Sequence, residues 1–552
     1  MLYLQQIIFE MQTNYLTIPE LLKSSFGKFS NNDFLGFTDE KPLKYKEVQQ
    51  SVISVMAFLE NIGIEKGDKV AILSNNMPNW GITYFAIVSM GAIAVPILPD
   101  FSSDEIENIL THSETKAIFC AELLIRKIED IQTEYLTSKI KINDFTSIDV
   151  HNNVKYDANI KSTKTYEVDA EDTAVIIYTS GTTGKSKGVM LSHKNISFNG
   201  EKCGVLQPIF ESDRFLSFLP LSHSYENTLG LILPMMNGAS VYYLRKVPTP
   251  AILIPAMQEV KPTLMLSVPL IIEKIYKNKI LPTFNAKKLT RTLYKVPVFR
   301  KLLNKVAGKK LKETFGGQLR FFGIGGAKLD PTVEKFLMEA EFPYAIGYGL
   351  TETSPLVAGV SPQTIRLQST GPQIEGIEIK LNDIEPKTGE GEIWVKGPSV
   401  MQGYYKEPQL TAEVITEDGW FKTGDLACFD KDNFVFIKGR SKNVIIGSSG
   451  ENIYPEEIES IINNFHFVTE SLVVEQKGKL VALVHFNREE LEKKYQDLKE
   501  ELDDKILELT TDLKFYINSK VNKFSTIKII TVQKNPFEKT PTQKIKRYKY
   551  IL

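Results

Sequence analysis

The sequence predicts an α/β protein with a large N-terminal domain of parallel sheets, a β-rich subdomain, and a small, mobile α+β C-terminal domain. Three observations predict it. Strand-like runs alternate with helical patterns through most of the chain, short strands with Gly and Asp turns begin near residue 375, and the pattern changes again beyond Arg440. Alternation of strands and helices implies parallel sheets covered by helices. The 552 residues also exceed what one core of about 150 residues usually organises.

The strands of the N-terminal domain are expected where β-branched or aromatic residues form short apolar runs. These runs cover residues 70–73, 92–97, 173–178, 240–244, 263–268 and 319–323. Helical patterns between them include 104–111 and 331–340. The second of these helices has Asp330 as its N-cap and Pro331 at its first position, which is the usual order of helix-starting residues.

Residues 70–99 contain no charged side chain and could be taken for a membrane segment. A spanning helix needs about 20 continuous apolar residues. Here Asn75, Asn76, Pro78, Asn79 and Pro96 interrupt the run. The order strand, helix from about Pro78, strand therefore favours a buried βαβ unit, whose strands read as continuous apolar segments.

The remaining chain is expected to form two smaller units. Residues 375–439 would be an antiparallel or barrel-like subdomain of an N-terminal domain that covers 1–439. Residues 440–552 would be the C-terminal domain. It combines a helix at 454–464, strands at 471–475 and 480–486, a polar helical stretch at 488–513 and a basic tail.

Composition excludes several classes of protein. The 66 Lys and Arg residues balance 67 acidic residues, so no overall positive field favours a nucleic acid partner. Three widely separated cysteines exclude a disulfide-built scaffold and favour a reducing, cytoplasmic location. The first residues lack the basic segment of a signal peptide. No pattern specifies an oligomeric state.

One segment departs from this balance. Residues 274–312 contain thirteen Lys or Arg residues and no Asp or Glu, interleaved with apolar side chains. Two interpretations stay open: a solvated basic helical face, or a surface that meets an anionic membrane or a phosphate-bearing ligand.

The segment 178–188 directly follows an apolar strand and combines features that suit polyphosphate oxygens. Two glycines and four hydroxyl residues precede Lys185, so backbone N–H groups, hydroxyl donors and a cation are available. The Walker A pattern is absent, because Thr179 stands where it requires Gly.

Two further glycine clusters resemble dinucleotide-binding loops but lack the third glycine. Lys328 takes its place in 323–328, and Glu352 takes it in 347–352. The second cluster adds the Tyr348 ring, the Thr351 hydroxyl and the Glu352 carboxylate. Together these suit an adenine face, a phosphate oxygen and a Mg²⁺ ion.

Taken with these clusters, the chain resembles the adenylate-forming superfamily, and within it the AMP-forming long-chain fatty acyl-CoA synthetases. Seven motifs occur in the order of that superfamily. They cover residues 178–188, 219–226, 348–354, 391–397, 419–425, 437–442 and 539–547.

The resemblance implies an ATP site. The loop Thr179–Lys185 would hold the β- and γ-phosphates, and Asp425 would accept hydrogen bonds from both ribose hydroxyls with help from Arg440. Thr351 would bind the α-phosphate, and Glu352 would ligate Mg²⁺, with Ser180 as a second ligand. The residues expected at the nucleotide are Thr179, Ser180, Gly181, Thr182, Thr183, Gly184, Lys185, Gly325, Gly326, Ala327, Gly347, Tyr348, Gly349, Thr351, Asp425 and Arg440.

The resemblance also implies a two-step reaction. Lys544 would reach from the C-terminal domain to the substrate carboxylate and the α-phosphate, with His223 beside the carboxylate; Lys544, Glu352, Thr351 and His223 are thus the expected catalytic residues. The C-terminal domain would then rotate about Lys442. Gly450 would line the tunnel through which the thiol of CoA arrives, because a narrow channel leaves no room for a Cβ.

The substrate implied is a long-chain fatty acid, so the protein would be a fatty acid–CoA ligase that uses ATP, Mg²⁺ and CoA. The stretch 222–227 lacks the Asp that amino-acid-activating relatives use, and Glu226 would partner His223. Transfer to the phosphopantetheine of a carrier protein is the alternative. The basic segment would suit a cytoplasmic enzyme that collects acids at the inner face of a membrane.

Overall fold

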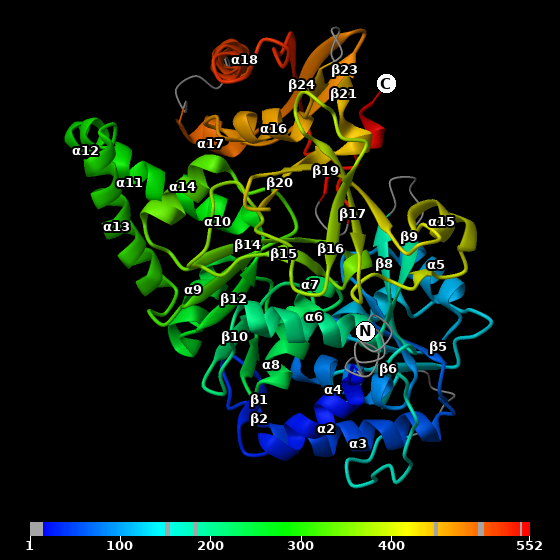
Figure 1. The fold of residues 1–552 in the computed structure, drawn as a ribbon. Coiled ribbons are helices and arrows are strands. Elements are labelled where there is room, and N and C mark those ends of the chain that lie inside the picture. Colours follow the sequence, from blue (N-terminus) through cyan, green and yellow to red (C-terminus); the bar gives the residue numbers. More distant parts are fainter. Residues whose placement is uncertain are drawn as a thin grey trace, which may run out of the picture.

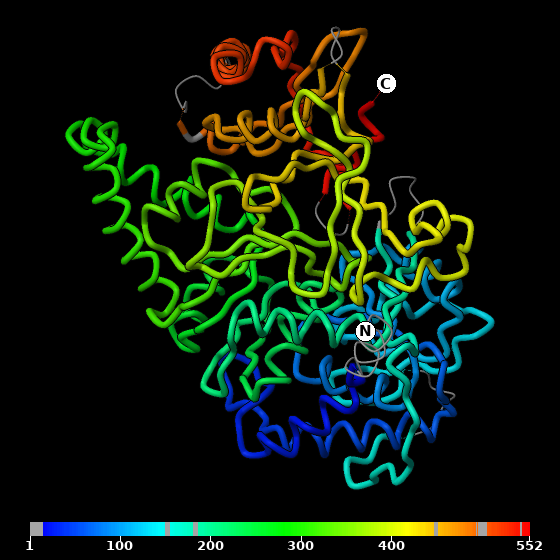
Figure 2. The backbone as a smooth tube through the Cα atoms, in the orientation of Figure 1, coloured from blue at the N-terminus to red at the C-terminus, as the bar shows by residue number. Residues whose placement is uncertain are grey.

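A computed structural model describes residues 15–148, 155–180, 186–446, 451–494, 502–540 and 544–551. Figure 1 shows two helix-covered sheets below and a smaller C-terminal unit above. The backbone trace in Figure 2 runs from the N-terminal half at the bottom, through the yellow β-rich segment, to the orange and red C-terminal segment at the top. This mixed α/β architecture confirms the predicted fold class.

The first sheet has eight strands in the order β18-β9-β8-β4-β3-β5-β6-β7. Its centre is parallel, whereas β9 forms an antiparallel hairpin with β8. The bounds are β3 Lys69–Leu73, β4 Ile93–Ile97, β5 Thr115–Cys120, β6 Ser138–Lys141, β7 Thr146–Ser147, β8 Thr173–Ser180, β9 Ser186–Ser192 and β18 Gly403–Tyr404.

The uncharged segment at 70–99 forms the expected βαβ unit. Strand β3 pairs in parallel with β4, and α4 (Pro78–Ser89) connects them. Ten of the twelve α4 residues are buried. A parallel sheet covered on both faces accounts for such a continuous apolar run. Among the described residues, every helix is too short or too polar to cross a bilayer.

The second sheet has eight strands in the order β15-β14-β13-β12-β10-β11-β1-β2. Only the edge strands β2 and β15 run antiparallel to their neighbours. The bounds are β1 Asp33–Phe37, β2 Leu43–Lys44, β10 Arg214–Ser217, β11 Ser240–Tyr243, β12 Leu264–Ser267, β13 Phe321–Ile324, β14 Tyr344–Gly349 and β15 Leu356–Gly359. In such sheets ligands bind beyond the carboxyl ends of the strands, where the glycine clusters after β13 and in β14 lie.

Helices cover both sheets, and their buried side chains join them in one large core. The helices up to residue 260 are α2 Ile18–Lys28, α3 Tyr45–Asn61, α4, α5 Ser103–Ser113, α6 His193–Leu206, α7 Ser224–Asn227, α8 Leu233–Met236 and α9 Pro250–Val260. A π-helical turn, Thr228–Ile232, joins α7 to α8. Helix α14 (Pro331–Glu339) begins as expected, since the Asp330 side chain accepts hydrogen bonds from the N–H groups of Thr332 and Val333.

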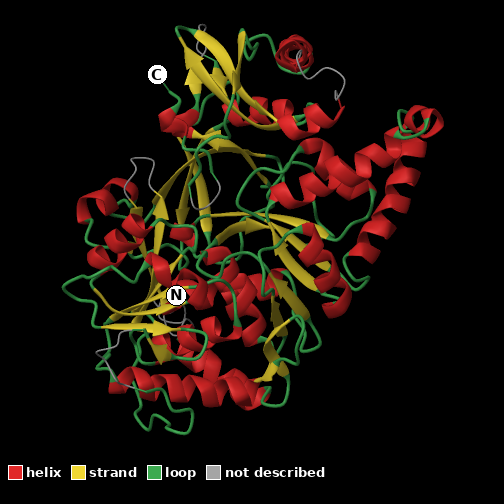
Figure 3. Cartoon of the chain, turned by 180° about the vertical axis from the view of Figure 1, so that it is seen from behind, coloured by secondary structure: helices red, strands yellow, loops and turns green. Residues whose placement is uncertain are grey.

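The basic segment 274–312 folds into a helical arm, residues 269–314, that projects from the body (Figure 3). It consists of α10 Pro269–Ile275, a π-helical turn at Tyr276–Ile280, α11 Leu281–Asn285, α12 Lys288–Leu293 and α13 Pro297–Thr314.

The β-rich segment is a four-stranded antiparallel sheet in the order β16-β17-β19-β20. The bounds are β16 Glu378–Asn382, β17 Gly391–Lys396, β19 Phe421–Phe429 and β20 Val435–Arg440, with α15 (Pro408–Val414) before β19. Antiparallel strands here agree with the change of pattern seen near residue 375.

The C-terminal unit has hydrophobic clusters of its own, separate from the large core. It contains a hairpin of β21 (Ile445–Ile446) and β22 (Asn452–Ile453), a sheet in the order β23-β24-β25, and helices against that sheet. The bounds are α16 Pro455–Asn463, β23 Val468–Gln476, β24 Lys479–Phe486, α17 Arg488–Lys494, α18 Leu502–Asn518 and β25 Ile529–Gln533. The boundary at residue 440 stays a prediction.

Candidate active site

Asp425 lies at the centre of a cluster formed by three strands. It is 6% exposed and stands opposite Arg440 in the β19–β20 pair. The Arg440 Nε lies 2.9 Å from Asp425 Oδ1, and the Tyr348 hydroxyl at the end of β14 donates to Oδ2 at 2.7 Å. Burial raises the pKa of Asp425, and the Arg440 charge opposes that rise. The carboxylate is therefore fixed in direction by a cation on one side and a phenol on the other.

The backbone around Asp425 is held by its neighbour Thr423. The Thr423 hydroxyl accepts from the Asp425 N–H at 3.0 Å and donates to the Ile393 carbonyl of β17 at 2.8 Å. The Thr423 carbonyl accepts from Arg440 at 3.0 Å. Between them Gly424 has a φ of +70°, a conformation that favours glycine. The Thr-Gly-Asp sequence thus places its carboxylate through a local turn.

Thr351 and Glu352 follow β14 in a short 3₁₀ turn, Thr351–Thr353. The Tyr404 hydroxyl of β18 donates to Glu352 Oε1 at 3.0 Å, and the Met401 N–H donates to the Glu352 carbonyl at 2.9 Å. The second sheet and the strand that pairs with β9 in the first sheet therefore meet at Glu352. Sequence reasoning missed Tyr404, since nothing in its local pattern indicates a contact with a residue 52 positions away.

Gly349, the last residue of β14, cannot be replaced by a residue with a side chain. A Cβ at Gly349 would lie 1.8 Å from the Pro355 carbonyl oxygen. Only glycine allows the chain to turn there between β14 and β15.

His223 is the N-cap of α7, and its Nδ1 accepts a hydrogen bond from the Tyr225 N–H at 3.3 Å. A neutral imidazole with Nδ1 as acceptor carries its proton on Nε2 and can donate there. Burial, with the Lys544 charge as a second cause, lowers the pKa of His223 to about 4. His223 is therefore a neutral hydrogen-bond donor near Lys544.

Lys544 brings the C-terminal unit to this cluster. Burial and the Arg440 charge lower the pKa of its ammonium, whereas Asp425 and Glu352 oppose that shift. The residue as a whole is still exposed, so its desolvation by the surrounding protein is partial. Lys544 thus lies within electrostatic reach of Arg440, Asp425 and Glu352 on one side and of His223 on the other, although 321 positions separate His223 from Lys544 in sequence.

The glycine cluster after β13, Gly323–Ala327, packs against Tyr225. A Cβ at Gly325 would lie 3.2 Å from the Tyr225 ring, and one at Gly323 would lie 3.0 Å from its hydroxyl oxygen. Gly326 has a φ of +85°. Gly347 has another neighbour, because a Cβ there would lie 2.7 Å from Leu356 Cδ1. The sequence analysis did not identify Tyr225. Its ring explains why Gly323 and Gly325 have no side chains, since a Cβ at either position would crowd it.

Several expected residues lie partly or wholly outside the described part of the chain. Thr179 and Ser180 end β8 and pair with Lys187 and Ser186 of β9. The rest of the loop, Gly181, Thr182, Thr183, Gly184 and Lys185, lies outside the described residues, as does Gly450. Lys442 is exposed in the 3₁₀ turn Ser441–Asn443 that leads into the C-terminal unit.

Glu226 is not the hydrogen-bond partner of His223 that the sequence analysis expected. Within the described residues no hydrogen bond joins the two side chains, and Glu226 Oε2 has no partner. The carboxyl group is 2% exposed, and burial raises its pKa to about 8, so it is protonated at neutral pH. The π-helical turn beside it accommodates the group, since a Cβ at Gly230 would lie 2.5 Å from Glu226 Oε1.

The apolar residues that follow Glu226 belong to the large core. They are Leu229, Leu231, Ile232, Leu233, Met235 and Met236, of which all but Met236 are buried.

Contacts beside the site link the C-terminal unit to the base of the arm. Lys277 donates to the carbonyls of Asn463 and Val468 at 3.0 and 2.8 Å, and so caps the end of α16. Asp330, which also caps α14, accepts from Ser460 at 3.1 Å and from Asn464. These bonds stabilise the arrangement in which Lys544 faces Asp425 and Glu352.

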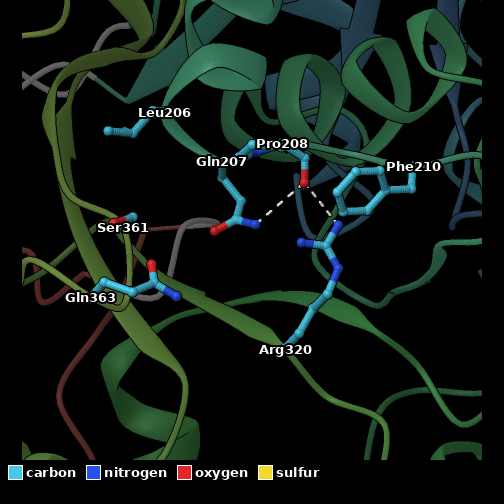
Figure 4. Close-up of a pocket in the computed structure, with 7 residues that line it drawn as sticks. All are labelled: Leu206, Gln207, Pro208, Phe210, Arg320, Ser361 and Gln363. Carbon is cyan, nitrogen blue, oxygen red and sulfur yellow. Dashed lines mark hydrogen bonds between the residues drawn. The ribbon is translucent and has the colours of Figure 1, made fainter.

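A pocket of about 340 Å³ lies elsewhere on the second sheet. Arg320, Gln363 and the end of α6 line it, as Figure 4 shows. Arg320 directly precedes β13 and Gly325 directly follows it, so the pocket lies at the opposite end of this strand from Gly325. The Arg320 guanidinium is already bound to Asp213 and to the Pro208 carbonyl. The pocket contains none of the expected site residues.

Comparison with known proteins gives consistent results. The family model described as AMP-binding enzyme matches residues 25–405. Long chain acyl-CoA synthetase 1 of Arabidopsis thaliana is 30% identical, with 95% of this chain and 88% of the relative covered. The chloroplastic long-chain-fatty-acid–[acyl-carrier-protein] ligase AEE15 of the same plant is 27% identical over 87% and 78% of the two chains. Long-chain-fatty-acid–CoA ligase FadD15 of Mycobacterium bovis is 28% identical over 79% and 75%.

Solved structures support the fold. ATP-bound MatB from Rhodopseudomonas palustris superimposes with a TM-score of 0.76 at 23% identity, covering 97% of this chain and 98% of MatB. The o-succinylbenzoate CoA synthetase MenE of Bacillus subtilis, in complex with its acyl-adenylate, gives 0.75 at 22% identity, covering 96% and 97%.

Proposed function

The chain belongs to the AMP-binding enzyme family, and from that premise we propose that it is an AMP-forming fatty acid–CoA ligase. It activates a long-chain fatty acid with ATP and Mg²⁺ and transfers the acyl group to CoA. The observation that carries the proposal is the position of Lys544, which lies within electrostatic reach of His223 and of the Asp425 cluster that Arg440 and Tyr348 hold in place. The long-chain acyl-CoA synthetases among the relatives support the class of acid.

The nucleotide is held by groups from strands β14, β19 and β20, from the turn after β13 and from the loop after β8. Asp425 accepts from the ribose hydroxyls, because its carboxylate oxygens keep free lone pairs beside Arg440 and Tyr348. Gly325, Gly326, Ala327, Gly347, Tyr348 and Gly349 line the base, and Thr351 binds the α-phosphate with Arg440 nearby. The loop Thr179–Lys185 binds the outer phosphates. These assignments rest on the position of each residue in the motifs and on the geometry of the Asp425 cluster.

Glu352 suits a magnesium ligand. Within the described residues Oε1 accepts from Tyr404, while no hydrogen bond occupies Oε2. A hard oxygen donor of this kind, together with phosphate oxygens and the Ser180 hydroxyl, matches the ligands that Mg²⁺ takes. Bound Mg²⁺ would neutralise phosphate charge as pyrophosphate departs.

In the first step the fatty acid carboxylate attacks the α-phosphorus and pyrophosphate leaves. Two anions approach one another, so positive charge is required where they meet. Lys544 supplies it between the carboxylate and the α-phosphate, and the His223 Nε2–H donates to the carboxylate. In the second step the CoA thiolate attacks the acyl carbon and AMP leaves. Rotation of the C-terminal unit about Lys442 withdraws Lys544 and brings Gly450 to the acyl carbon.

The basic segment indicates where in the cell the enzyme acts. We place it in the cytoplasm, in peripheral contact with the inner face of an anionic membrane through residues 274–312. A long-chain acid partitions into bilayers, so such contact brings the enzyme to its substrate.

Two assays test the proposal. The first measures acid-dependent exchange of labelled pyrophosphate into ATP, which reports adenylation alone. The second supplies palmitate, Mg-ATP and either CoA or a holo-carrier protein, and identifies the thioester formed. We expect exchange only with the acid present and palmitoyl-CoA as the product. Absence of exchange refutes the adenylating function, and acylation of the carrier alone assigns the acceptor that the AEE15 relative is named for.

The pH dependence of adenylation follows from the two perturbed bases. We expect no inflection due to His223 between about pH 5.5 and 7.5, because its pKa lies near 4. The rate should fall as rising pH removes the Lys544 proton, at a pH below the ordinary pKa of lysine. Single-turnover rates with excess Mg²⁺ measure the profile. Lys544→Arg should remove the alkaline fall, since arginine keeps its proton there. An inflection near pH 6.5 that disappears in His223→Asn would contradict this account.

Tyr404 is expected to act as a positioning residue for Glu352. Tyr404→Phe removes one hydrogen bond to a carboxylate, and such bonds contribute about 1.5 kcal/mol, or roughly tenfold. We expect that loss mainly in the KM for Mg-ATP, with a partial rescue at raised Mg²⁺. Tyr405→Phe, one position along, is the control, because the Tyr405 hydroxyl points to Glu114 at 3.3 Å. Equal effects in the two variants would refute a specific role for Tyr404.

A further inference from the structure

The arm ends in a helical hairpin formed by α12 and α13, which we call the docking hairpin (residues 287–314). Side-chain contacts hold its two helices to each other and to α11. The Tyr294 ring stacks on Phe284 with centroids 4.6 Å apart, and the Tyr294 hydroxyl donates to Asn304 Oδ1 at 3.1 Å. Figures 1 and 3 both show it extending away from the two sheets.

One face of α13 is committed to the body of the protein. Arg300 binds Glu339 at 2.8 Å, and Asn304 donates to the same carboxylate at 2.7 Å. Gly308 approaches α14 so closely that a Cβ there would lie 2.3 Å from the Ala340 carbonyl oxygen. These contacts recur at positions i, i+4 and i+8 and fix which side of the helix faces outward.

The outward face carries an apolar stripe. Val298, Leu302 and Val306 recur every four residues and are 75%, 60% and 53% exposed. A second stripe of the same period, Lys301, Lys305 and Lys309, lies beside it. Leu289 of α12 adds a further apolar side chain, 70% exposed, at the tip. Large apolar side chains exposed together on a helix that also carries lysines are typical of helices that lie in a membrane interface.

Most of the positive charge on the arm has no counterpart in the described protein. Of its thirteen Lys and Arg residues, Arg300 and Lys305 have ion-pair partners among the described residues, namely Glu339 and Glu341. Lys277 binds backbone carbonyls instead. The ten others are Lys274, Lys279, Lys287, Lys288, Arg291, Lys295, Lys301, Lys309, Lys310 and Lys312.

We propose that the docking hairpin is the membrane-binding element, and that its partner is an anionic lipid bilayer. Val298, Leu302, Val306 and Leu289 enter the boundary between headgroups and acyl chains, and the flanking lysines contact lipid phosphates. An apolar insertion plus a basic cluster supplies the two signals that stable peripheral attachment needs. This inference rests on the proposed function only in that the substrate acid resides in the bilayer.

The position of the hairpin links membrane binding to the active site. Lys277, at the base of the arm that carries the hairpin, caps α16 of the unit that carries Lys544, so the arm links the membrane-facing hairpin to the adenylation arrangement. A bilayer is favoured over an acidic protein because a row of three apolar side chains and a row of three lysines run side by side on one helix, so apolar and phosphate contacts can form together.

Vesicle co-sedimentation of the full chain tests the proposal. We expect binding to phosphatidylglycerol–phosphatidylcholine vesicles, weaker binding to pure phosphatidylcholine, and loss of binding as salt rises. Val298→Ser/Leu302→Ser/Val306→Ser should weaken binding to the anionic vesicles by about tenfold or more. The matched control, Leu123→Ser/Val205→Ser/Val247→Ser, changes three side chains that are 84%, 66% and 74% exposed elsewhere and should bind like the unmodified chain.

A second variant and a second assay keep the outcomes distinct. Lys301→Gln/Lys309→Gln/Lys310→Gln should reduce binding and its salt dependence. Both hairpin variants should retain octanoate activation, because this acid dissolves in water, and an unchanged thermal midpoint shows that they fold. Equal vesicle binding by the serine variant and its control overturns the proposal. The proposal is also overturned if the chain does not bind vesicles and the hairpin variants abolish its self-association. It is overturned likewise if the chain does not bind vesicles and the hairpin variants abolish its binding to a carrier protein. Absence of palmitate-dependent pyrophosphate exchange in the unmodified chain refutes the function and leaves the vesicle result to be judged by itself.

Discussion

Lys544→Ala is expected to slow formation of the acyl-adenylate by about 10²- to 10³-fold, the usual cost of one preorganised charge aimed at a transition state. Lys544 lies within electrostatic reach of Asp425, Glu352 and Arg440 and is the cation that the C-terminal unit adds to the site. Transfer of the acyl group from supplied acyl-AMP to CoA should be largely unchanged, because Lys544 has left the site by then.

Two separate measurements check this expectation. Acid-dependent pyrophosphate exchange reports the first step, and thioester formation from synthetic palmitoyl-AMP reports the second. Lys546→Ala is the control, since it removes a charge from the same basic tail two residues away. A comparable loss in both steps would count against the two-position mechanism, and an equal effect of Lys546→Ala would mean that only the total charge of the tail matters.

The C-terminal unit carries Lys544, so it must be held in place while the acyl-adenylate forms. Lys277 and Asp330 bind the end of α16 while Lys544 faces the cluster, so the adenylation arrangement has polar contacts of its own at the other side of the C-terminal unit. These contacts exchange easily with water, because hydrogen bonds of this kind contribute only about 1 kcal/mol each. A unit held in this way can be stable in one position and still move.

The fold was accessible from the sequence because it rests on local periodicity. The β3–α4–β4 unit follows from an uncharged run with a proline at its helix start, and α14 follows from Asp330 and Pro331. The second oxygen of Asp330 was not foreseeable. It accepts from α16, 130 residues further on, and no local pattern encodes such a contact.

The site divides in the same way. Asp425, Glu352 and Lys544 came from resemblance, since their motifs are ordered but far apart. Tyr404 and Tyr225 were missed because their contacts cross between strands. The expected bond between His223 and Glu226 was wrong. Both residues belong to the motif at 219–226, but the His223 ring turns back to cap its own helix.

Asp425→Asn is expected to lower kcat/KM for ATP by about 10²-fold. Two ribose hydroxyls lose a charged acceptor, and hydrogen bonds to charged groups contribute about 1.5–3 kcal/mol each, against about 1 kcal/mol for neutral ones. The substitution keeps the shape of the side chain, so Tyr348 and Thr423 can retain their hydrogen bonds. Loss of the Asp425 charge also removes a group that favours protonated Lys544, which adds to the defect.

A nucleotide that lacks both hydroxyls isolates the ribose contribution. The unmodified enzyme should use 2′,3′-dideoxy-ATP about 10²-fold less well than ATP, and in Asp425→Asn this penalty should fall below about tenfold, because the two changes remove the same interaction. If the penalties simply multiply, Asp425 does not contact the ribose and its carboxylate serves to hold Arg440 and Tyr348. Arg440→Lys separates these cases further, since it alters the cation beside Asp425 but leaves the hydroxyl acceptor in place, and so should preserve the discrimination against the dideoxy nucleotide while lowering the rate with both.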